Sequence, residues 1–309
     1  MKRLGIFLIS VLLVLVALDF LAKYLIDRYT DTHILPGDCA SIDYSIKAAD
    51  EDVIILGNSR VLNSLMPTIL SDSLGLSVYN AASNGQMLPF FHSIQEAILN
   101  RHSPKALIIG IDEQTMSDSG IGERYNILAP YYGKGYNMID SCMSMGGWSQ
   151  KIMVNSTFYR YNNIWWRILL YHFVSDKNHS KDGFISKPIP PHEPKLVIDS
   201  TKVELNPERF FELKEMVKSA VEKEISVILL KAPQYVIRYD NLAINKKIRE
   251  LADAYPNVWL VDDESDSLFL SRPDLFFDSG HLNYKGAEIY SRIKASQISK
   301  YLTTRDITN

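Results

Sequence analysis

Two short segments near opposite ends of the chain carry residue types that together can perform acyl chemistry. Ser59 follows the apolar run 53–56, and Asp278 stands three residues before His281. A serine hydroxyl is a weak nucleophile until a base removes its proton, and a histidine base needs a third group to orient its ring. Ser59, His281 and Asp278 are therefore candidates for the nucleophile, the base and the orienting carboxylate of a serine-dependent acyl enzyme.

Each part of this set also has a purely structural interpretation. Ser59 can be the N-cap of a helix that begins after the strand, which is a common use of serine. Asp278 or Asn283 can cap the final helix, which leaves His281 as a surface residue. The pairing of Asp278 with His281 favours the catalytic interpretation, because in a turn a carboxylate at this offset can reach the imidazole and fix its tautomer.

Short apolar runs alternate with longer amphipathic stretches, and these elements must position the candidate residues. The pattern predicts strands at 53–56, 76–79, 106–111, 226–230 and 258–261, and helices at 60–73, 88–101, 207–223, 240–254 and 284–301. This alternation predicts an α/β fold with a flavodoxin-like, doubly wound parallel sheet of five strands. The ligand site of such a sheet lies at the carboxyl ends of its strands, where Ser59, residues 80–85, Asp278 and His281 all fall.

The alternation stops over residues 113–206, which we expect to form an insertion within an α/β domain at 51–302. An insertion after the third strand lies over the edge that carries the candidate site, so it is a candidate lid or substrate subdomain. Its aromatic rings can either stack on sugar rings or pack a small core, and we favour packing for most of them. These aromatic residues are Trp148, Trp165, Trp166, Tyr125, Tyr131, Tyr132, Tyr136, Tyr159, Tyr161 and Tyr171.

The N-terminal segment is apolar enough to cross a membrane. Two basic residues precede an uncharged apolar run at 4–18, and apolar character continues through residue 26. A helix over 4–26 is about 35 Å long, which is enough to span a hydrocarbon core of about 30 Å. Asp19 and Lys23 lie four residues apart within this helix, so they share one face and can pair near the outer interface.

We expect the segment 1–28 to be an uncleaved signal anchor, because no small-x-small cleavage pair follows the apolar run. The positive-inside rule keeps Lys2 and Arg3 in the cytoplasm and places the rest of the chain on the periplasmic or extracellular side. A cleaved signal peptide with a poor cleavage site is the alternative, and it changes the tether but not the compartment. Residues 29–50, with a turn signal at Pro36-Gly37-Asp38, are expected to be a polar connector.

Composition excludes several classes of function. The 309 residues are 46% hydrophobic and carry a net charge of −3, with no Lys/Arg cluster of the kind that nucleic acid demands. The two cysteines, Cys39 and Cys142, match no metal motif, and two buried thiols are favoured over one disulfide bridge. The sequence implies no metal and no organic cofactor.

Three segments resemble, in order, the first, second and fifth sequence blocks of the SGNH/GDSL hydrolase family. They are Gly57-Asn58-Ser59-Arg60, Asn80-Ala81-Ala82-Ser83-Asn84-Gly85 and 278–287, and the resemblance covers about 52–301 with 113–206 outside it. The resemblance implies a serine nucleophile at Ser59, a histidine base at His281 and an orienting aspartate at Asp278. It also implies an oxyanion hole formed by the backbone N–H groups of Ser59 and Gly85.

The third block departs from the family pattern. The family has Gly-x-Asn-Asp after the third strand, and the asparagine completes the oxyanion hole, whereas this chain has Gly110-Ile111-Asp112-Glu113-Gln114. A carboxylate would repel an oxyanion, so Asp112 is not expected to take that role, and Gln114 or Asn84 is the candidate replacement. Losing one such donor costs on the order of 10²–10³ in rate, which argues against efficient hydrolysis. Membrane-tethered acyltransferase members of the family often relax this block too, so the resemblance implies transfer.

The closing His-Leu-Asn-x-x-Gly-Ala pattern at 281–287 and the N-terminal anchor are similar to a membrane-tethered branch of this family. That branch moves acyl groups onto cell-surface polymers, as the alginate O-acetylation proteins and the D-alanyl transfer protein of teichoic acid do. The resemblance implies an O-acyltransferase or esterase for acyl groups, with acetyl as our expectation, on a cell-surface or extracellular glycan. It further implies a multipass membrane protein as acyl donor. A non-catalytic member that binds glycan or scaffolds a surface-polymer assembly is the alternative.

Overall fold

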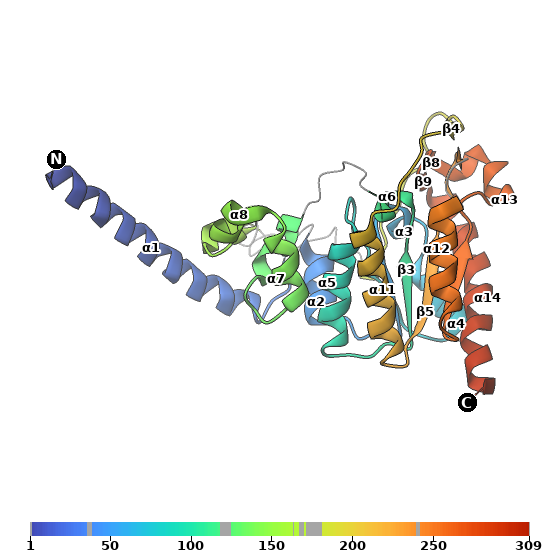
Figure 1. The fold of residues 1–309 in the computed structure, drawn as a ribbon, viewed down its shortest axis with the longest axis horizontal. Coiled ribbons are helices and arrows are strands. Elements are labelled where there is room, and N and C mark those ends of the chain that lie inside the picture. The colour runs from blue at the N-terminus through green and yellow to red at the C-terminus, as the bar shows by residue number, and fades with distance from the viewer. Residues whose placement is uncertain are drawn as a thin grey trace. The chain divides into compact units, whose positions relative to one another are not determined.

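The chain is seen here in a computed structural model, which describes residues 2–35, 39–117, 125–162, 164–166, 170, 181–238 and 242–308 (Figure 1). It divides into two compact units, each made of two chain segments. Unit 1 contains Met1–Tyr44 and Tyr125–His179, and unit 2 contains Ser45–Arg124 and Ser180–Asn309. The domain boundaries expected from the sequence stay predictions.

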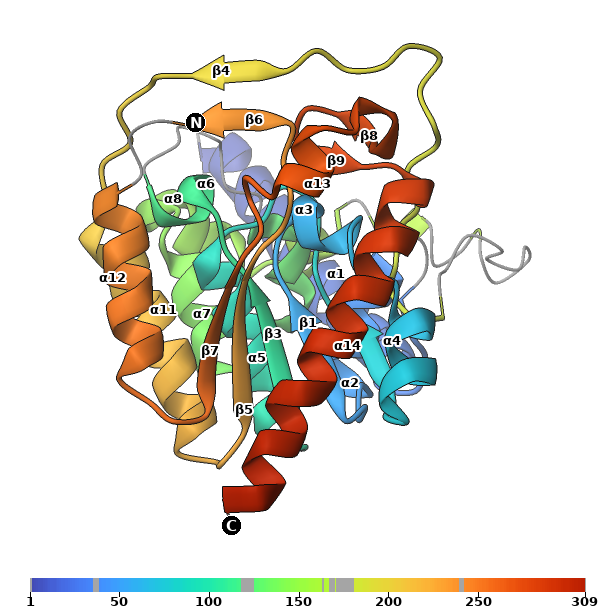
Figure 2. The same ribbon diagram turned by 90° about the vertical axis from the view of Figure 1, so that its right-hand side faces the viewer.

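Unit 2 is built on a five-stranded parallel sheet (Figure 2). Its strands are β1 (Val53–Leu56), β2 (Val78–Asn80), β3 (Ala106–Gly110), β5 (Ser226–Lys231) and β7 (Val258–Asp262). They follow the order β2-β1-β3-β5-β7, with every neighbouring pair parallel. This is the flavodoxin-like order, so the predicted fold class is confirmed, together with all five predicted strands within two residues at each end.

Helices cover both faces of this sheet, as Figures 1 and 2 show. Helices α4 (Pro67–Leu74) and α14 (Tyr284–Thr308) pack together on one face, while α5 (Leu88–Leu99) and α11 (Pro207–Val221) pack together on the other. Helix α12 (Leu242–Asp253) packs against β7. Because both faces are covered, every residue of β1, β3 and β5 is buried, which explains why these strands are continuous apolar runs.

The core between the sheet and α14 joins residues that are far apart in the sequence. It contains Val53, Ile55, Ala106, Ile108, Ile228 and Leu230 from the sheet and Leu70, Tyr290 and Ile298 from the helices. The final helix therefore closes the apolar face of the first strands, and the chain must be complete to residue 298 before this core is filled.

The helix expected over 60–73 is wrong, because two helices occupy this stretch. Helix α3 (Ser59–Leu62) ends early, and α4 begins at Pro67. Met66 is extended at φ −89° and ψ 108°, since the ring of a following proline pushes the preceding residue out of the helical region. Helix α14 also continues past the predicted residue 301 to Thr308.

Four short strands in unit 2 were not predicted. Strands β4 (Val197–Asp199) and β6 (Val236–Arg238) pair in parallel, and β8 (Phe276–Asp278) and β9 (His281–Leu282) form an antiparallel hairpin. None is longer than three residues, which is too short for an alternating apolar pattern to appear in the sequence.

Unit 1 is helical in its described part. Helix α1 (Lys2–Thr30) is long and apolar enough to cross a membrane by length and composition. The other elements are the 3₁₀ helix η2 (Tyr125–Tyr131), α7 (Asn137–Ser144), α8 (Gly147–Met153) and α9 (Thr157–Arg160). Helix α9 packs against α1.

The polar connector expected at 29–50 is wrong in part, because α1 extends to Thr30 and a further helix, α2 (Ala40–Lys47), follows. Ile42 and Ile46 lie one helical turn apart and are both buried, so α2 is held by an apolar face that is too short to stand out in the sequence. The expected turn at Pro36-Gly37-Asp38 lies outside the described residues. Both cysteines are buried thiols, as favoured from the sequence.

The aromatic residues of the expected insertion separate by type. The tyrosines are buried or half-buried, with Tyr125, Tyr131 and Tyr161 at 7%, 2% and 0% exposure, so core packing is confirmed for them. Trp148, Trp165 and Trp166 are instead exposed, so packing describes most of these rings but not these three. Tyr171 lies outside the described residues.

Candidate active site

A hairpin presents the two C-terminal candidates side by side. Strands β8 and β9 are antiparallel, and Asp278 pairs directly with His281 across the two-residue loop Ser279-Gly280. The backbone N–H of Gly280 donates a 2.8 Å hydrogen bond to Asp278 Oδ1, which fixes the carboxylate within the turn. The spacing of three residues therefore works because it makes aspartate and histidine cross-strand neighbours.

Ser59 is positioned by a sharp turn at the end of β1. Gly57 has φ +155°, and a Cβ there would lie 3.2 Å from the Cα of Gly110, so a larger residue would push β1 and β3 apart. Asn58 then acts as the N-cap of α3, since its side-chain oxygen accepts a hydrogen bond from the backbone N–H of Arg60. The structural alternative for Ser59 is wrong, because Asn58 is the capping residue and the serine hydroxyl is left for another contact.

The structure brings Ser59, His281 and Asp278 into one chain of contacts. Ser59 Oγ lies 2.7 Å from His281 Nε2, and His281 Nδ1 lies 2.8 Å from Asp278 Oδ1 and 3.0 Å from Asp278 Oδ2. A carboxylate can only accept, so Nδ1 carries the ring proton and Nε2 is left to accept from the serine hydroxyl. His281 and Asp278 are 24% and 48% exposed at their side chains, so a substrate can reach this chain of contacts.

The electrostatics of the site keep Asp278 ionised. Burial raises the pKa of this carboxyl, but hydrogen bonds from His281 and the backbone N–H of Gly280 outweigh burial and bring the pKa below its ordinary value. A carboxylate in this position stabilises the imidazolium that forms when the histidine accepts a proton. This negative charge beside Nδ1 is the condition that a general base at Nε2 requires.

The second structural alternative is also decided by the structure. Asn283, not Asp278, caps α14, because its side-chain oxygen accepts a 3.0 Å hydrogen bond from the backbone N–H of Gly286. The amide nitrogen of Asn283 donates to the backbone oxygens of Asp274 and Phe276, which holds the start of β8 against the helix. His281 therefore has a fixed position between two supported segments.

Asp112, where the sequence departs from the resembled pattern, has bonding partners that the sequence did not reveal. Asp112 is buried at 3% exposure, and its Oδ2 lies 2.7 Å from Arg60 Nη1 and accepts a 2.7 Å hydrogen bond from Asn58 Nδ2. Its other oxygen accepts from the backbone N–H of Thr115 and so caps the helix α6 (Glu113–Met116). The pattern Asp112-x-x-Thr115 is that of a capping box and was the available signal. Asp112 thus holds both chain neighbours of Ser59, Asn58 and Arg60, in place.

The remaining oxyanion candidates differ in their surroundings. The backbone N–H of Ser83 donates a 2.9 Å hydrogen bond to the oxygen of Gly57, which ties the loop after β2 to the turn that carries Ser59. Gly85 in this loop has φ +67° and is exposed, as is Asn84. Gln114 is half-buried, and its side-chain oxygen accepts a 3.2 Å hydrogen bond from Arg60 Nη2, which leaves its amide nitrogen as the donor group.

A buried ionic cluster at the same edge of the sheet was missed by the sequence analysis. Lys231 at the end of β5 contacts the carboxylates of Glu264 and Glu113, the latter at 3.2 Å, and Asn245 Oδ1 at 3.0 Å. Arg238 of β6 contacts Glu113 at 2.7 Å and Glu264 at 2.9 Å. These contacts attach β6, and with it β4, to the ends of the central strands.

The described residues, which leave out short segments of the chain, hold no group of three or more His, Cys, Asp or Glu side chains that could bind a metal.

Few known proteins resemble this chain in the comparisons made of its sequence and structure. No protein-family model and no curated protein matches the chain. Among solved structures, it is similar to the lipase/acylhydrolase from Enterococcus faecalis, with a TM-score of 0.39 and 12% sequence identity over 80% of this chain and 95% of that chain. The fold class is established by the strand order of the sheet.

Proposed function

We propose that this protein is a membrane-anchored, serine-dependent O-acyltransferase or esterase of the SGNH type. Its substrate would be the acyl groups, most simply acetyl groups, of a cell-surface or extracellular glycan. The observation that carries the proposal is the continuous contact from Ser59 Oγ through the His281 ring to the Asp278 carboxylate. Nucleophile, base and orienting group within hydrogen-bond reach are the geometric signature of nucleophilic acyl catalysis.

The reaction follows from these contacts. Ser59 Oγ attacks the acyl carbonyl while its proton moves to His281 Nε2, and Asp278 stabilises the imidazolium. When the tetrahedral intermediate collapses, the imidazolium returns this proton to the leaving alkoxide, and the acyl group stays on Ser59 as an ester. A sugar hydroxyl or water then gives its proton to Nε2 as it attacks this ester, and Ser59 recovers a proton when it leaves.

The backbone N–H groups of Ser59 and Gly85 would hold the negative oxygen of the tetrahedral intermediate. Within the described residues, the N–H of Ser59 has no hydrogen-bond acceptor, and its place at the start of α3 supports this role. Asp112 is engaged by Arg60 and Asn58, so a third donor must come from Asn84 or Gln114. The resemblance to membrane-tethered acyltransferases that also relax this block supports transfer to a sugar hydroxyl over hydrolysis.

The cellular arrangement is part of the proposal. Helix α1 would anchor the chain with Lys2 and Arg3 in the cytoplasm and unit 2 on the other side of the membrane. One helix cannot carry an acyl donor across a bilayer, so a separate multipass membrane protein would supply the acyl group. The length and composition of α1 support the anchor.

A non-catalytic role, as a glycan-binding or scaffold protein, is the second candidate. The observation that favours it is Asp112, which stands where an oxyanion donor would be expected and is locked to Arg60. In this case the contacts of Ser59 would be a remnant without reactivity toward electrophiles.

Reaction with a fluorophosphonate separates the two functions. An active site should attach the phosphonyl group to Ser59 with loss of fluoride, because the probe takes the place of the acyl group. We expect mass spectrometry of the digested full-length protein to find the label on Ser59. Ser59→Ala and His281→Ala should abolish labelling, while Ser83→Ala, in the neighbouring loop, should retain it. Folded protein that does not label would favour the scaffold role.

The anchor has its own test. If α1 is retained, the mature protein keeps its first residues and stays with membranes after a high-salt wash, because apolar burial does not weaken with salt. Intact-mass analysis of the membrane fraction checks both points. Recovery of a soluble form that begins between residues 18 and 35 would show instead that the segment is a cleaved signal peptide.

A further inference from the structure

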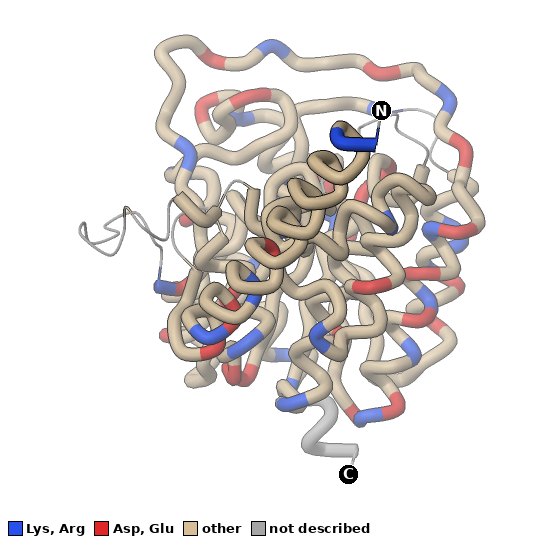
Figure 3. The backbone as a smooth tube through the Cα atoms, turned by 90° about the vertical axis from the view of Figure 1, so that its left-hand side faces the viewer, with Lys and Arg blue, Asp and Glu red and all other residues tan. Residues whose placement is uncertain are grey.

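The uncharged part of α1 is too short to cross a bilayer by itself. Residues 4–18 rise about 22 Å, while the hydrocarbon core is about 30 Å thick. Figure 3 shows α1 with basic residues at its first turn and a long uncharged stretch behind them. If Lys2 and Arg3 lie at one interface, about five residues beyond Leu18 still fall within the opposite leaflet.

Asp19 lies in this remaining stretch, and its carboxylate is occupied by α9. It accepts hydrogen bonds from Ser156 Oγ at 2.8 Å and from the backbone N–H groups of Thr157 and Phe158 at 3.0 and 3.1 Å. The pair with Lys23 that the spacing allows is therefore replaced, because the free N–H groups at the start of α9 take the carboxylate instead. These three bonds hold the start of α9 at the depth of Asp19.

A second set of contacts joins α1 to the same segment, closer to the end of α1. Asp27 Oδ1 lies 3.2 Å from Lys134 Nζ and accepts a 3.4 Å hydrogen bond from the hydroxyl of Tyr161. Asp27 follows Asp19 by eight residues, which is about 12 Å along α1. The segment 134–161 is thus fixed beside the part of α1 that passes from the outer leaflet into water.

Large apolar and aromatic side chains are exposed on these helices. Trp148 and Ile152 lie one turn apart on α8 and are 77% and 64% exposed. Phe158 on α9 and the pair Trp165 and Trp166 are each about half exposed. The sole charge of α8 is Lys151, a cation whose long side chain can reach lipid phosphates. A water-facing surface would not carry so many large apolar groups.

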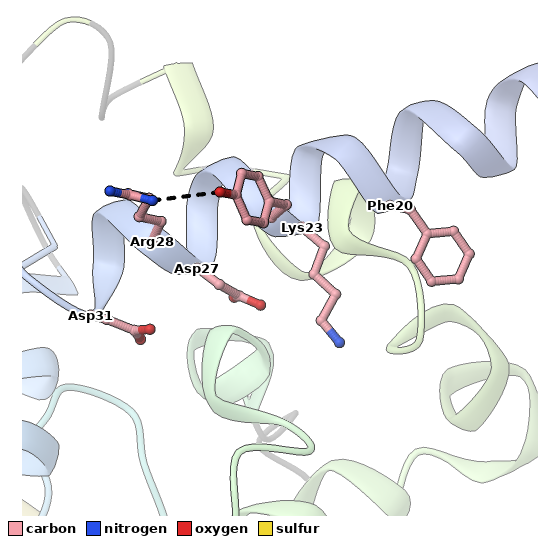
Figure 4. A pocket seen from close by; sticks show the side chains of 6 residues that line it. Phe20, Lys23, Asp27, Arg28 and Asp31 are labelled. Carbon is pink, nitrogen blue, oxygen red and sulfur yellow. Dashed lines mark hydrogen bonds between the residues drawn. The ribbon is translucent and has the colours of Figure 1, made fainter.

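The residue types along α1 change over the same stretch, between Asp19 and the end of the helix. A groove of about 480 Å³ runs along the helix and is lined by Phe20, Lys23, Tyr24, Asp27, Arg28 and Asp31 (Figure 4). Phe20 and Tyr24 come first, with Lys23 between them, and the charged residues Asp27, Arg28 and Asp31 follow. This order is typical of a helix that leaves the bilayer through its interface.

We propose that the apolar side chains of α8, α9 and residues 165–166 are inserted in the outer leaflet beside α1, as a second membrane contact. The inference rests on the proposed anchor. It assigns the exposed tryptophans to lipid, because the bonds at Asp19 and Asp27 place their helices at the interface, where Trp is enriched. Unit 1 is then a platform seated on the membrane.

Tryptophan quenching tests this on the full chain. One variant keeps only Trp148 (Trp165→Phe, Trp166→Phe, Trp259→Phe), and the matched control keeps only Trp259, which stacks on Tyr301 in unit 2. Both are reconstituted into phosphatidylcholine/phosphatidylglycerol vesicles with plain or brominated acyl chains. We expect brominated lipid to remove fluorescence from Trp148 and not from Trp259, and aqueous acrylamide to quench Trp259 more than Trp148.

Flotation of the vesicles distinguishes the inference from the anchor. If the protein floats and Trp148 is quenched only by acrylamide, the platform is wrong and the anchor stands. If it does not float after a salt wash, the anchor is wrong and the inference falls with it. Should a single-tryptophan chain fail to fold, Ile152→Cys labelled with a polarity-sensitive fluorophore reads the same surface, since both native cysteines are buried.

Discussion

Replacing Ser59 with alanine is expected to lower kcat/KM toward a small activated ester by on the order of 10³-fold or more. The variant loses the oxygen that His281 Nε2 contacts at 2.7 Å, and no ester can then form on the enzyme. His281→Ala is expected to cost a similar factor, because the serine then keeps its proton. Ester hydrolysis by the full-length protein in detergent measures both effects.

The double variant of Ser59 and His281 should be little worse than either single variant, because the two side chains act in one step. Asp278→Asn should cost less than loss of the nucleophile, since Ser59 remains but the ring loses its charged partner. All three side chains are partly exposed, so circular dichroism should show folded protein in each case. Full activity in a folded Ser59→Ala variant would refute the catalytic assignment.

Replacing Lys231 with methionine is expected to destabilise the fold by about 3–5 kcal/mol, because the two buried carboxylates of Glu113 and Glu264 then share Arg238 as their one remaining cation. Burial lowers the pKa of Lys231, but Glu264, Glu113 and Asp262 outweigh burial and raise it, so the side chain is charged in the native state. Methionine matches the length of the lysine stem, so the loss isolates the charge. Urea unfolding of the purified protein measures the change.

The pH dependence of this loss has a definite sign. Burial and the neighbouring Glu113 raise the pKa of Glu264 to about 7, so this carboxyl takes up a proton as the pH falls through that value. A protonated Glu264 is neutral, so it has no charge that the lysine must compensate. The cost of Lys231→Met should therefore be larger at pH 8 than at pH 5.5.

A second substitution provides the matched control. Glu264→Gln in the Lys231→Met background removes the excess negative charge, and Arg238 then faces the single carboxylate of Glu113 at 2.7 Å. The double variant should recover part of the lost stability and lose the pH dependence. Equal stability of the single variant and the parent protein at pH 8 would show that the cluster contributes nothing.

Several properties of this protein could be predicted from the sequence because they depend on local patterns. Continuous apolar runs such as 53–56 and 106–110 predicted strands buried on both faces, and their alternation with helices predicted the parallel sheet. The position of Ser59 after the first strand and the offset between Asp278 and His281 were sufficient to select the site residues. Strand ends of a parallel sheet share one edge, so topology alone placed them together.

Other properties were decided only by contacts between distant segments. Asp112 and Arg60 are separated by 52 positions, and the ion pair between them arises because the turns after β1 and β3 lie side by side. The cluster around Lys231 joins residues from the ends of three strands and from β6, and no local pattern encodes such a meeting.

The exposure of the tryptophans is a clear example of a property that the sequence pattern did not predict. Sequence composition marked residues 113–206 as aromatic, but a tryptophan on a short helix has the same local signal whether it is buried or exposed. Contacts between distant segments, such as those that join Asp19 to α9 and Asp27 to Lys134, hold this part of the chain against α1, and Trp148 lies outside the core. The sequence by itself determined the sheet and the candidate triad, because both follow from periodicity and strand ends. Burial and pairing were left to the tertiary structure, because they depend on which distant segments meet.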